Sequence, residues 1–143
     1  MENTQSGLLI ERLADMCIQM SGDFCGFARF NRQQNRIYWA AITGAVSDRH
    51  EQLAIKPGVG LLGQTIRHGR PFLIDSSTLE IEQERHNNPI MLMERLACAL
   101  AVPVWQEDAV IGVLLIGNRT LKKYKSQEIQ SAQQFASALF IEE

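Results

Sequence analysis

Two β-prone runs near the end of the chain constrain the fold most strongly. They cover residues 98–105 and 109–116, are dominated by aliphatic side chains, and are separated only by the polar residues 106–108. A short polar connection between two such runs is typical of an antiparallel hairpin. We expect this hairpin to form the centre of a sheet, with Val110 and residues 113–116 among the most buried positions.

A second hairpin and two short strands extend the predicted sheet. Residues 24–30 and 36–43 are rich in aromatic and β-branched side chains and are joined by a polar turn at residues 31–35. Short strands are predicted at residues 52–56 and 71–75, next to proline and glycine residues that end or begin them. The predicted sheet is therefore antiparallel and has about six strands.

Amphipathic helices are predicted at both ends of the chain. Apolar residues recur at helical intervals between residues 4 and 20. The last helix is predicted to begin near Ser126, which would serve as its N-cap, with Glu128 in the first turn. A long mobile loop over residues 75–88 and a short helix over residues 90–94 are expected before the central hairpin. This order of elements indicates the α+β class.

Residues 58–63 read G-x-G-x-x-G, which is the pattern of a dinucleotide-binding loop. Such a loop requires a repeated βαβ unit with a long helix after the glycines. Here the helix is predicted only over residues 60–68, because Gly69 and Pro71 end it, and hairpins surround it. Asp75 follows a strand and merely resembles an acidic ribose ligand. A dinucleotide site is therefore not expected.

The same glycines allow a structural and a functional interpretation. Structurally, Gly58 and Gly60 would supply positive φ angles in a tight turn, and Gly63 would let the helix approach the sheet. Functionally, the first amides of a helix lack intrahelical acceptors and lie at the positive end of its dipole, which favours a bound anion. The amides that would form this site belong to Gly60, Leu61, Leu62 and Gly63.

Composition and charge argue against several classes of function. The chain has 143 residues, which we expect to form a single domain (1–143), and its net charge of -2 provides no field that attracts nucleic acid. The longest apolar run, residues 110–116, is too short to span a membrane, and no signal peptide opens the chain. We therefore expect a cytoplasmic protein that binds neither nucleic acid nor membrane.

No pattern of catalytic or metal-binding residues is visible in the sequence. Cys17, Cys25 and Cys98 match no metal-binding spacing and are interpreted as small buried hydrophobes in a reducing compartment. The three histidines fall in expected loops or helix ends and indicate no haem ligand. Paired carboxylates and nucleophile motifs are also missing. We therefore expect neither an enzyme nor a bound metal or cofactor.

Four stretches of the chain together resemble the GAF domain, a small-molecule sensing fold. Their order and spacing cover the chain from about residue 8 to residue 140. The resemblance implies a GAF fold, with a central antiparallel sheet, N- and C-terminal helices packed on one face and a ligand pocket on the other. The matching stretches are residues 58–66, 69–72, 100–104 and 110–114, which read GVGLLGQTI, GRPF, LAVPV and VIGVL.

Within this family the chain is most similar to the stand-alone NreA-type nitrate receptors. The similarity implies nitrate as the ligand and a sensor histidine kinase as the partner, whose autophosphorylation the receptor inhibits unless nitrate is bound. The residues that carry it are 26–28, Trp39, Gly44, Arg49, 58–60, 66–67 and 70–72.

The same similarity gives Trp39 the role of an aromatic pocket wall. Because side chains alternate along a strand, Tyr38 and Trp39 cannot both face the pocket. Apolar walls that exclude water are expected from Ile55, Leu61, Ile90 and Met91. We further expect the loop over residues 75–88 to close over the bound ligand.

Two other interpretations stay open. The protein could be an interaction or dimerisation module with a vestigial pocket, because apolar residues lie off the core stripes of both terminal helices and offer a candidate homodimer seam. The second interpretation is a different ligand, such as a cyclic nucleotide. The sequence signature of GAF domains that bind cyclic nucleotides has only a weak counterpart at residues 118–128, and this counterpart has a structural explanation. GAF-type methionine sulfoxide reductases need reactive pocket cysteines, and Cys98 lacks their surrounding acidic pattern. The candidate seam consists of Ile10, Cys17, Ile18, Phe140 and Ile141.

Overall fold

Six strands form one antiparallel sheet. The computed structural model describes residues 2–48 and 53–140. The strands lie in the order β3-β2-β1-β6-β5-β4, and each neighbouring pair is antiparallel. The predicted α+β class and the predicted number of strands are confirmed. The strands are β1 (Phe24–Asn31), β2 (Arg36–Thr43), β3 (Ala54–Ile55), β4 (Phe72–Ile74), β5 (Cys98–Gln106) and β6 (Ala109–Asn118).

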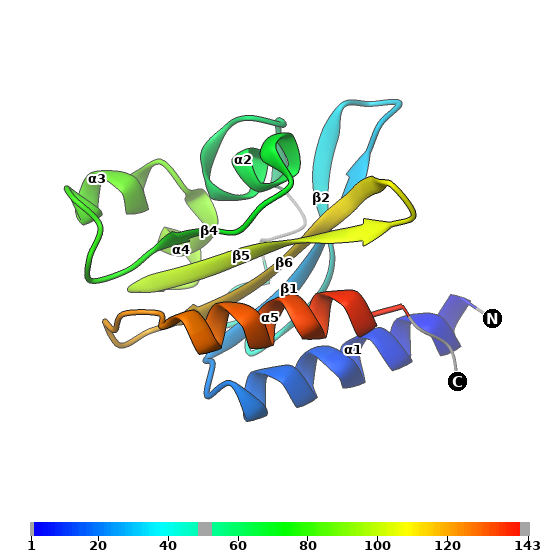
Figure 1. The fold of residues 1–143 in the computed structure, drawn as a ribbon, viewed down its shortest axis with the longest axis horizontal. Helices are drawn as coiled ribbons and strands as arrows, with labels where there is room; N and C mark the ends of the chain where they lie inside the picture. Colours follow the sequence, from blue (N-terminus) through cyan, green and yellow to red (C-terminus); the bar gives the residue numbers. More distant parts are fainter. Residues whose placement is uncertain (1, 49–52, 141–143) are drawn as a thin grey trace.

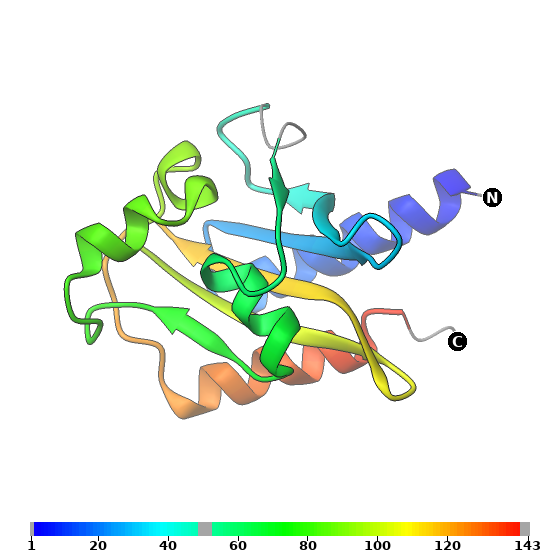
Figure 2. The ribbon, with the colours of Figure 1, turned by 90° about the horizontal axis from the view of Figure 1, so that it is seen from above.

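Helices cover both faces of this sheet. The first and last helices, α1 and α5, lie side by side across one face, as predicted, and the three shorter helices lie over the other (Figure 1). Seen from above, α2 lies over the middle of the sheet, and α3 and α4 lie towards one end (Figure 2). The helices are α1 (Glu2–Gln19), α2 (Gly60–His68), α3 (Ile81–His86), α4 (Pro89–Met93) and α5 (Ser126–Ala138).

Each face of the sheet has its own apolar core, because side chains alternate between the faces along a strand. On β6, Val113 and Leu115 belong to the core under α2 and α4, which we call the pocket-side core. The intervening Leu114 belongs to the core under α1 and α5, which we call the helix-pair core. Val110 and residues 113–116 are all buried, which confirms the prediction for the central hairpin.

The predicted long loop over residues 75–88 contains a helix, α3, so this part of the prediction is wrong. The helix has no buried residue, which explains why no apolar periodicity marks it in the sequence. It is stabilised by polar contacts instead: Arg85 pairs with Glu82 at 2.9 Å and donates through Nε to the carbonyl of Leu96 at 2.8 Å. Closure of this segment over a ligand stays a prediction.

The N-cap of α5 is Lys125 rather than the predicted Ser126. Glu128, in the first turn as expected, accepts a hydrogen bond from the Lys125 amide at 3.0 Å. The third helical residue therefore satisfies the backbone of the cap, so a serine hydroxyl is not needed. Arg49, Gln52 and Ile141, which figure in the sequence predictions, lie outside the described residues.

No helix within residues 2–48 and 53–140 combines the length and the apolar character that crossing a membrane requires.

Asp75 fastens the end of β4 to the segment that leads into α5. Its side chain is 1% exposed. The carboxylate accepts hydrogen bonds from the amide and hydroxyl of Ser77, at 2.9 and 2.6 Å, and from the amide of Tyr124 at 2.9 Å. These contacts give Asp75 a structural role, in agreement with the conclusion that it does not mark a ribose site.

Replacement of Asp75 by asparagine is expected to flatten the dependence of stability on pH in acid. Burial by itself would raise the pKa of Asp75, but the hydrogen bonds from Ser77 and Tyr124 outweigh it and hold the pKa below its usual 3.8. A lowered folded-state pKa stabilises the protein above the unfolded value, and this stabilisation is lost as the pH falls through the folded value. Wild type should therefore lose stability below about pH 4 more steeply than Asp75→Asn.

The measurement is urea unfolding as a function of pH. At neutral pH we expect Asp75→Asn to be less stable than wild type by about 1 to 3 kcal/mol, because buried amides lose a charged acceptor. Asp108→Asn makes the same chemical change in the exposed turn between β5 and β6 and serves as the control. Equal acid slopes for wild type and Asp75→Asn would contradict the prediction.

Candidate functional site

A cavity of about 320 Å³ lies between β3, the start of α2 and the start of α4. Apolar side chains form most of its wall, and Lys56 contributes a charged one. A cavity of this size and character suits a small ligand, because apolar walls keep out water that would compete for polar contacts. The lining residues are Leu53, Ile55, Lys56, Val59, Gly60, Leu62, Asn87, Asn88, Pro89 and Ile90.

The glycines at the start of α2 are required by the backbone. Gly58 and Gly60 have positive φ angles of 87° and 67°. A Cβ atom on Gly63 would lie 2.4 Å from the carbonyl oxygen of Lys56, and the Gly58 amide donates to the carbonyl of Gly63 at 2.7 Å. The positive φ angles predicted for Gly58 and Gly60 are therefore confirmed, whereas Gly63 lets the helix approach the preceding turn and not the sheet. This structural role of the glycines leaves the functional interpretation open, because the same turn brings backbone amides to the cavity.

Asn88 occupies part of the position predicted for an anion. Its Oδ1 accepts a hydrogen bond from the Leu61 amide at 2.7 Å, and its side-chain amide donates to the carbonyl of Glu84 at 2.7 Å. The Gly63 amide donates to the Val59 carbonyl at 3.2 Å. The prediction of four unpaired amides is therefore wrong for Leu61 and Gly63.

Two amides at the start of α2 stay available. Within residues 2–48 and 53–140, the backbone N–H groups of Gly60 and Leu62 have no hydrogen-bond acceptor. Both residues line the cavity, and both amides lie in the first turn, at the positive end of the helix dipole. These two backbone amides are fewer hydrogen-bond donors than the four that the sequence predicted, but both belong to residues that line the cavity.

Trp39 supplies a further donor without a partner. Its indole Nε1 is buried and has no hydrogen-bond acceptor among the described residues. The ring packs edge-on against Phe24, with ring centroids 5.9 Å apart, and belongs to the pocket-side core. Tyr38 points the other way and donates to Gln34 at 2.7 Å. Trp39 therefore lies on the pocket side of the sheet, but it is not among the residues that line the cavity, and its role as a pocket wall stays a prediction.

The eight predicted site residues fall into two groups. Ile55, Gly60, Leu62 and Ile90 line the cavity. Of the other four, Leu61 and Met91 lie in the pocket-side core, Trp39 packs against that core, and Gly63 is buried within α2. The structure brings both groups to the same face of the sheet, while their roles in ligand binding stay predictions.

Sequence reasoning missed the wall that the α3–α4 connection provides. Asn87 and Asn88 lie in the segment predicted as a mobile loop, and Pro89 directly follows it. A local signal existed, because asparagine followed by proline is typical of a helix start, and Pro89 is the first residue of α4. What the sequence could not supply is the contact between Asn88 and Leu61, which are 27 residues apart.

Glu94, which directly follows α4, holds the segment after β2 in place. Its side chain is fully buried and accepts hydrogen bonds from the amides of Val46 and Ser47, at 2.7 and 3.1 Å. Arg119 donates to the same carboxylate at 3.1 Å and to the Gly44 carbonyl at 2.9 Å. The C-terminal end of α4 is thus joined to residues 44–47, whose chain leads on towards the cavity.

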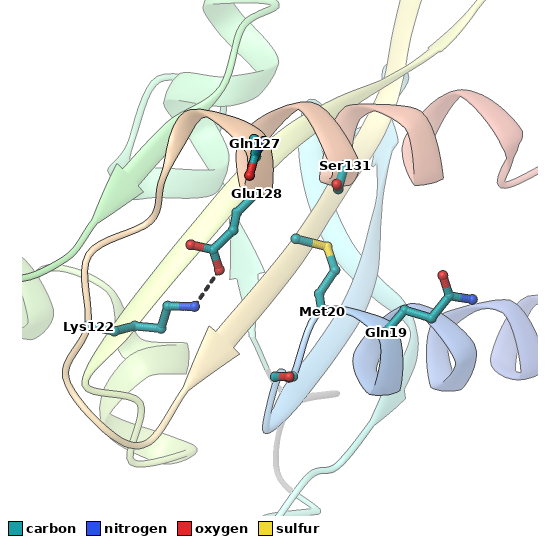
Figure 3. Close-up of a pocket in the computed structure, with 7 residues that line it drawn as sticks. Gln19, Met20, Lys122, Gln127, Glu128 and Ser131 are labelled. Carbon is teal, nitrogen blue, oxygen red and sulfur yellow. Dashed lines mark hydrogen bonds and ion pairs between the residues drawn. The ribbon is translucent and has the colours of Figure 1, made fainter.

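A second hollow, of about 340 Å³, lies on the opposite face between the end of α1 and the start of α5. Figure 3 shows Lys122 pointing towards Glu128 across it, and the two side chains form an ion pair. Because its charges already neutralise each other, this hollow offers less to an ionic ligand than the cavity beside α2. Its wall consists of Gln19, Met20, Ser21, Lys122, Gln127, Glu128 and Ser131.

The echo of a cyclic-nucleotide signature has a structural explanation, as the sequence suggested. The Tyr124 hydroxyl donates to Oδ1 of Asn118 at 2.9 Å, and the side-chain amide of Asn118 donates through Nδ2 to the Ser21 carbonyl at 2.8 Å. These buried contacts join the strand β6, the segment before α5 and the end of α1. They occupy the polar atoms of both side chains.

Comparison with known protein families decides the assignment that the fold suggests. A family model for the GAF domain matches residues 8–140. The chain belongs to the GAF domain family. No curated protein sequence is significantly similar to this GAF domain.

Solved structures include an informative relative. An NreA protein from Staphylococcus aureus that is mutated in its nitrate binding site is similar to this GAF domain, with a TM-score of 0.71 and 28% identity. The alignment covers 82% of this chain and 89% of that chain. The recognition of a GAF domain with likeness to NreA-type proteins is thereby confirmed.

Other solved GAF structures agree in fold at lower identity. The GAF domain of a phosphoenolpyruvate-protein phosphotransferase from Coxiella burnetii has a TM-score of 0.77 at 19% identity, covering 94% of this chain and 79% of that chain. A free methionine-R-sulfoxide reductase from Neisseria meningitidis, in complex with its substrate, has a TM-score of 0.73 at 17% identity, covering 92% and 72%. At such identities the likeness concerns the fold alone, and the expectation that this protein is not an enzyme stays a prediction.

Proposed function

We propose that this GAF domain is a nitrate receptor, which binds the anion beside the start of α2 and passes its state to a partner protein. The observation that carries the proposal is the buried indole N–H of Trp39, which has no acceptor among the described residues. A buried donor without a partner is rare and calls for an explanation, and an anion acceptor supplies one. The similarity to an NreA protein studied for its nitrate binding site supports the choice of nitrate.

The chemistry of nitrate suits the available donors. Nitrate is a small planar anion with a single charge, so a few neutral N–H groups and a helix dipole suffice to hold it. The candidate donors at the cavity wall are the amides of Gly60 and Leu62; the Trp39 indole N–H, which is buried on the same side of the sheet but does not line the cavity, would donate once the wall rearranges around the anion. Ile55 and Ile90 would exclude water from the anion, and Lys56 adds positive charge at the wall. A doubly charged anion such as sulfate would need more compensation than this set provides.

The proposed partner is a sensor histidine kinase, as the similarity to NreA-type receptors suggests. The receptor would report its state to this partner, because binding of nitrate would favour one of two conformations of the cavity wall. We propose that the wall formed by the α3–α4 connection carries this change, because it contacts both the cavity and the first turn of α2.

A second candidate function is an interaction module whose cavity no longer binds a ligand. The hydrogen bond from the Leu61 amide to Asn88 favours it, because a side chain of the protein itself satisfies one donor that an anion would otherwise use. This alternative predicts a folded protein that responds to no small anion.

Calorimetric titration with nitrate tests the proposal. We expect one saturable site for nitrate and much weaker binding of chloride, acetate and sulfate at constant ionic strength. At a nitrate concentration of about 100 times the dissociation constant, the free energy of unfolding should rise by about 2.7 kcal/mol. Nitrite and a cyclic nucleotide complete the series. No response to any of these ligands would favour the interaction module, whereas a response to the cyclic nucleotide alone would replace nitrate as the ligand.

A further inference from the structure

Two cysteines from different elements meet at one edge of the helix-pair core. Cys17 lies in the last turns of α1, and Cys25 is the second residue of β1. Cys25 is fully buried in the core, and the half-buried Cys17 packs against it. The third cysteine, Cys98, is buried on β5. The spacing of the three cysteines along the chain does not indicate which of them lie close together.

The turn between α1 and β1 holds the two thiols together. The Gly22 amide donates to the Cys17 carbonyl at 2.8 Å, and the Cys17 thiol donates to the Gly22 carbonyl at 3.1 Å. The chain therefore folds back on the end of the helix before it enters β1. As a result, both thiols lie at the same edge of the helix-pair core, and the Cys25 side chain is the neighbour that most strongly affects the Cys17 thiol.

We propose that Cys17 and Cys25 form an oxidisable dithiol, in which Cys17 reacts first with hydrogen peroxide and Cys25 then closes a disulfide. In the first step the Cys17 sulfur attacks a peroxide oxygen, the O–O bond breaks, and a sulfenic acid and one water form. In the second step the Cys25 sulfur attacks the Cys17 sulfur and the S–O bond breaks. The released hydroxyl leaves as a second water with the proton from Cys25.

The environments of the two thiols match these roles. Contact with the Cys25 thiol lowers the pKa of Cys17, burial and the charge of Asp23 oppose this, and the charge of Arg119 assists it. The same contact, together with burial, raises the pKa of Cys25. Cys17 is thus the partly exposed thiol with the greater thiolate character, which is the kind that oxidants attack first. Cys25 is shielded from the oxidant and reacts only with its neighbour.

Sheet geometry excludes the other internal pairing of Cys25. Cys25 on β1 is opposite Ile116 on β6, and Cys98 lies on β5, beyond β6. Two strand spacings amount to about 10 Å, whereas a disulfide needs Cα atoms within about 7 Å of each other. Cys98 is therefore a built-in control thiol.

Peptide mapping after limited treatment with hydrogen peroxide tests the proposal. Remaining thiols are alkylated in denaturant before tryptic digestion. Because both cysteines lie between Arg12 and Arg29, the disulfide appears as an internal loop in one tryptic peptide, residues 13–29, which lacks two hydrogen atoms and takes up no alkylating agent. We expect this peptide from wild type and from Cys98→Ser, and its recovery as the alkylated form after reduction.

Variants make the outcome decisive. Cys17→Ser replaces the partly exposed thiol, should fold normally and should leave Cys25 fully alkylated after peroxide. Alkylation of both thiols in the oxidised wild type would overturn the proposal, as would a sulfinic acid on Cys17 without the internal loop. A cross-link that contains Cys98 would also overturn it. Cys25→Ser should trap Cys17 as a sulfenic acid, and the Cys17→Ser result decides the matter if that variant does not fold.

Discussion

Replacement of Glu94 by alanine is expected to lower the free energy of unfolding by about 3 to 5 kcal/mol, as removal of one partner from a buried charge pair typically does. Glu94 is fully buried, and Arg119, 28% exposed in its side chain, would lose its carboxylate partner. The amides of Val46 and Ser47 would also lose their hydrogen bonds to Glu94. Urea denaturation at neutral pH measures the total loss of stability.

Two further variants separate charge from shape. Glu94→Gln keeps the volume but can present only one oxygen, so it should also be destabilised, although less than Glu94→Ala. Glu84→Ala removes an exposed glutamate from α3 and should change stability by no more than about 0.5 kcal/mol. Hydrogen exchange at residues 44–48 should increase in both Glu94 variants. A loss of less than about 1 kcal/mol in Glu94→Ala would show that the buried pair does not hold this segment.

Replacement of Trp39 by phenylalanine is expected to weaken nitrate binding by about ten- to a hundredfold, while the protein stays folded. This variant keeps an aromatic ring beside Phe24 and removes the N–H donor of the indole. A hydrogen bond to a charged group contributes about 1.5 to 3 kcal/mol, which corresponds to that loss of affinity. Because the lost donor has no partner among the described residues, the stability of the ligand-free protein should fall less than the affinity.

Trp105→Phe is the matched control for this measurement. Trp105 is the other tryptophan of the chain, lies at the end of β5 and is 51% exposed. Its replacement should leave nitrate affinity unchanged. If Trp39→Phe binds nitrate as well as wild type does, the indole is not a ligand, even if nitrate binding itself is real. Gly60→Pro is a poor test of the same site, because a φ angle of 67° is inaccessible to proline.

The elements that the sequence predicted well are those with local determinants. The predicted bounds of α2 agree with the structure because its end is encoded by adjacent residues: Gly69 takes a φ angle of 64° and Pro71 follows. Alternation along β2 is also local, and it explains why Tyr38 and Trp39 point to opposite faces of the sheet. Both hairpins followed from the composition of their strands and turns.

The features that the sequence did not predict depend on contacts between distant residues. Nothing near Leu61 indicates that Asn88 will accept its amide, and nothing near Glu94 indicates that it will be buried against Arg119 and Val46. Helix α3 escaped prediction because it buries no apolar stripe. The size of the donor set at the candidate site therefore became visible only in three dimensions.

The placement of α1 and α5 together on the face opposite the cavity has a practical consequence for protein engineering. α1 begins and α5 ends on that side of the sheet, near each other (Figure 1). A fluorescent protein attached beyond either helix would be carried away from the mouth of the cavity, so small molecules could still reach it. The surface turn between β5 and β6, which also leaves the cavity wall intact, offers an insertion point for a second fluorophore. This GAF domain is thus a convenient scaffold for an optical reporter of any small molecule that its cavity is shown to bind.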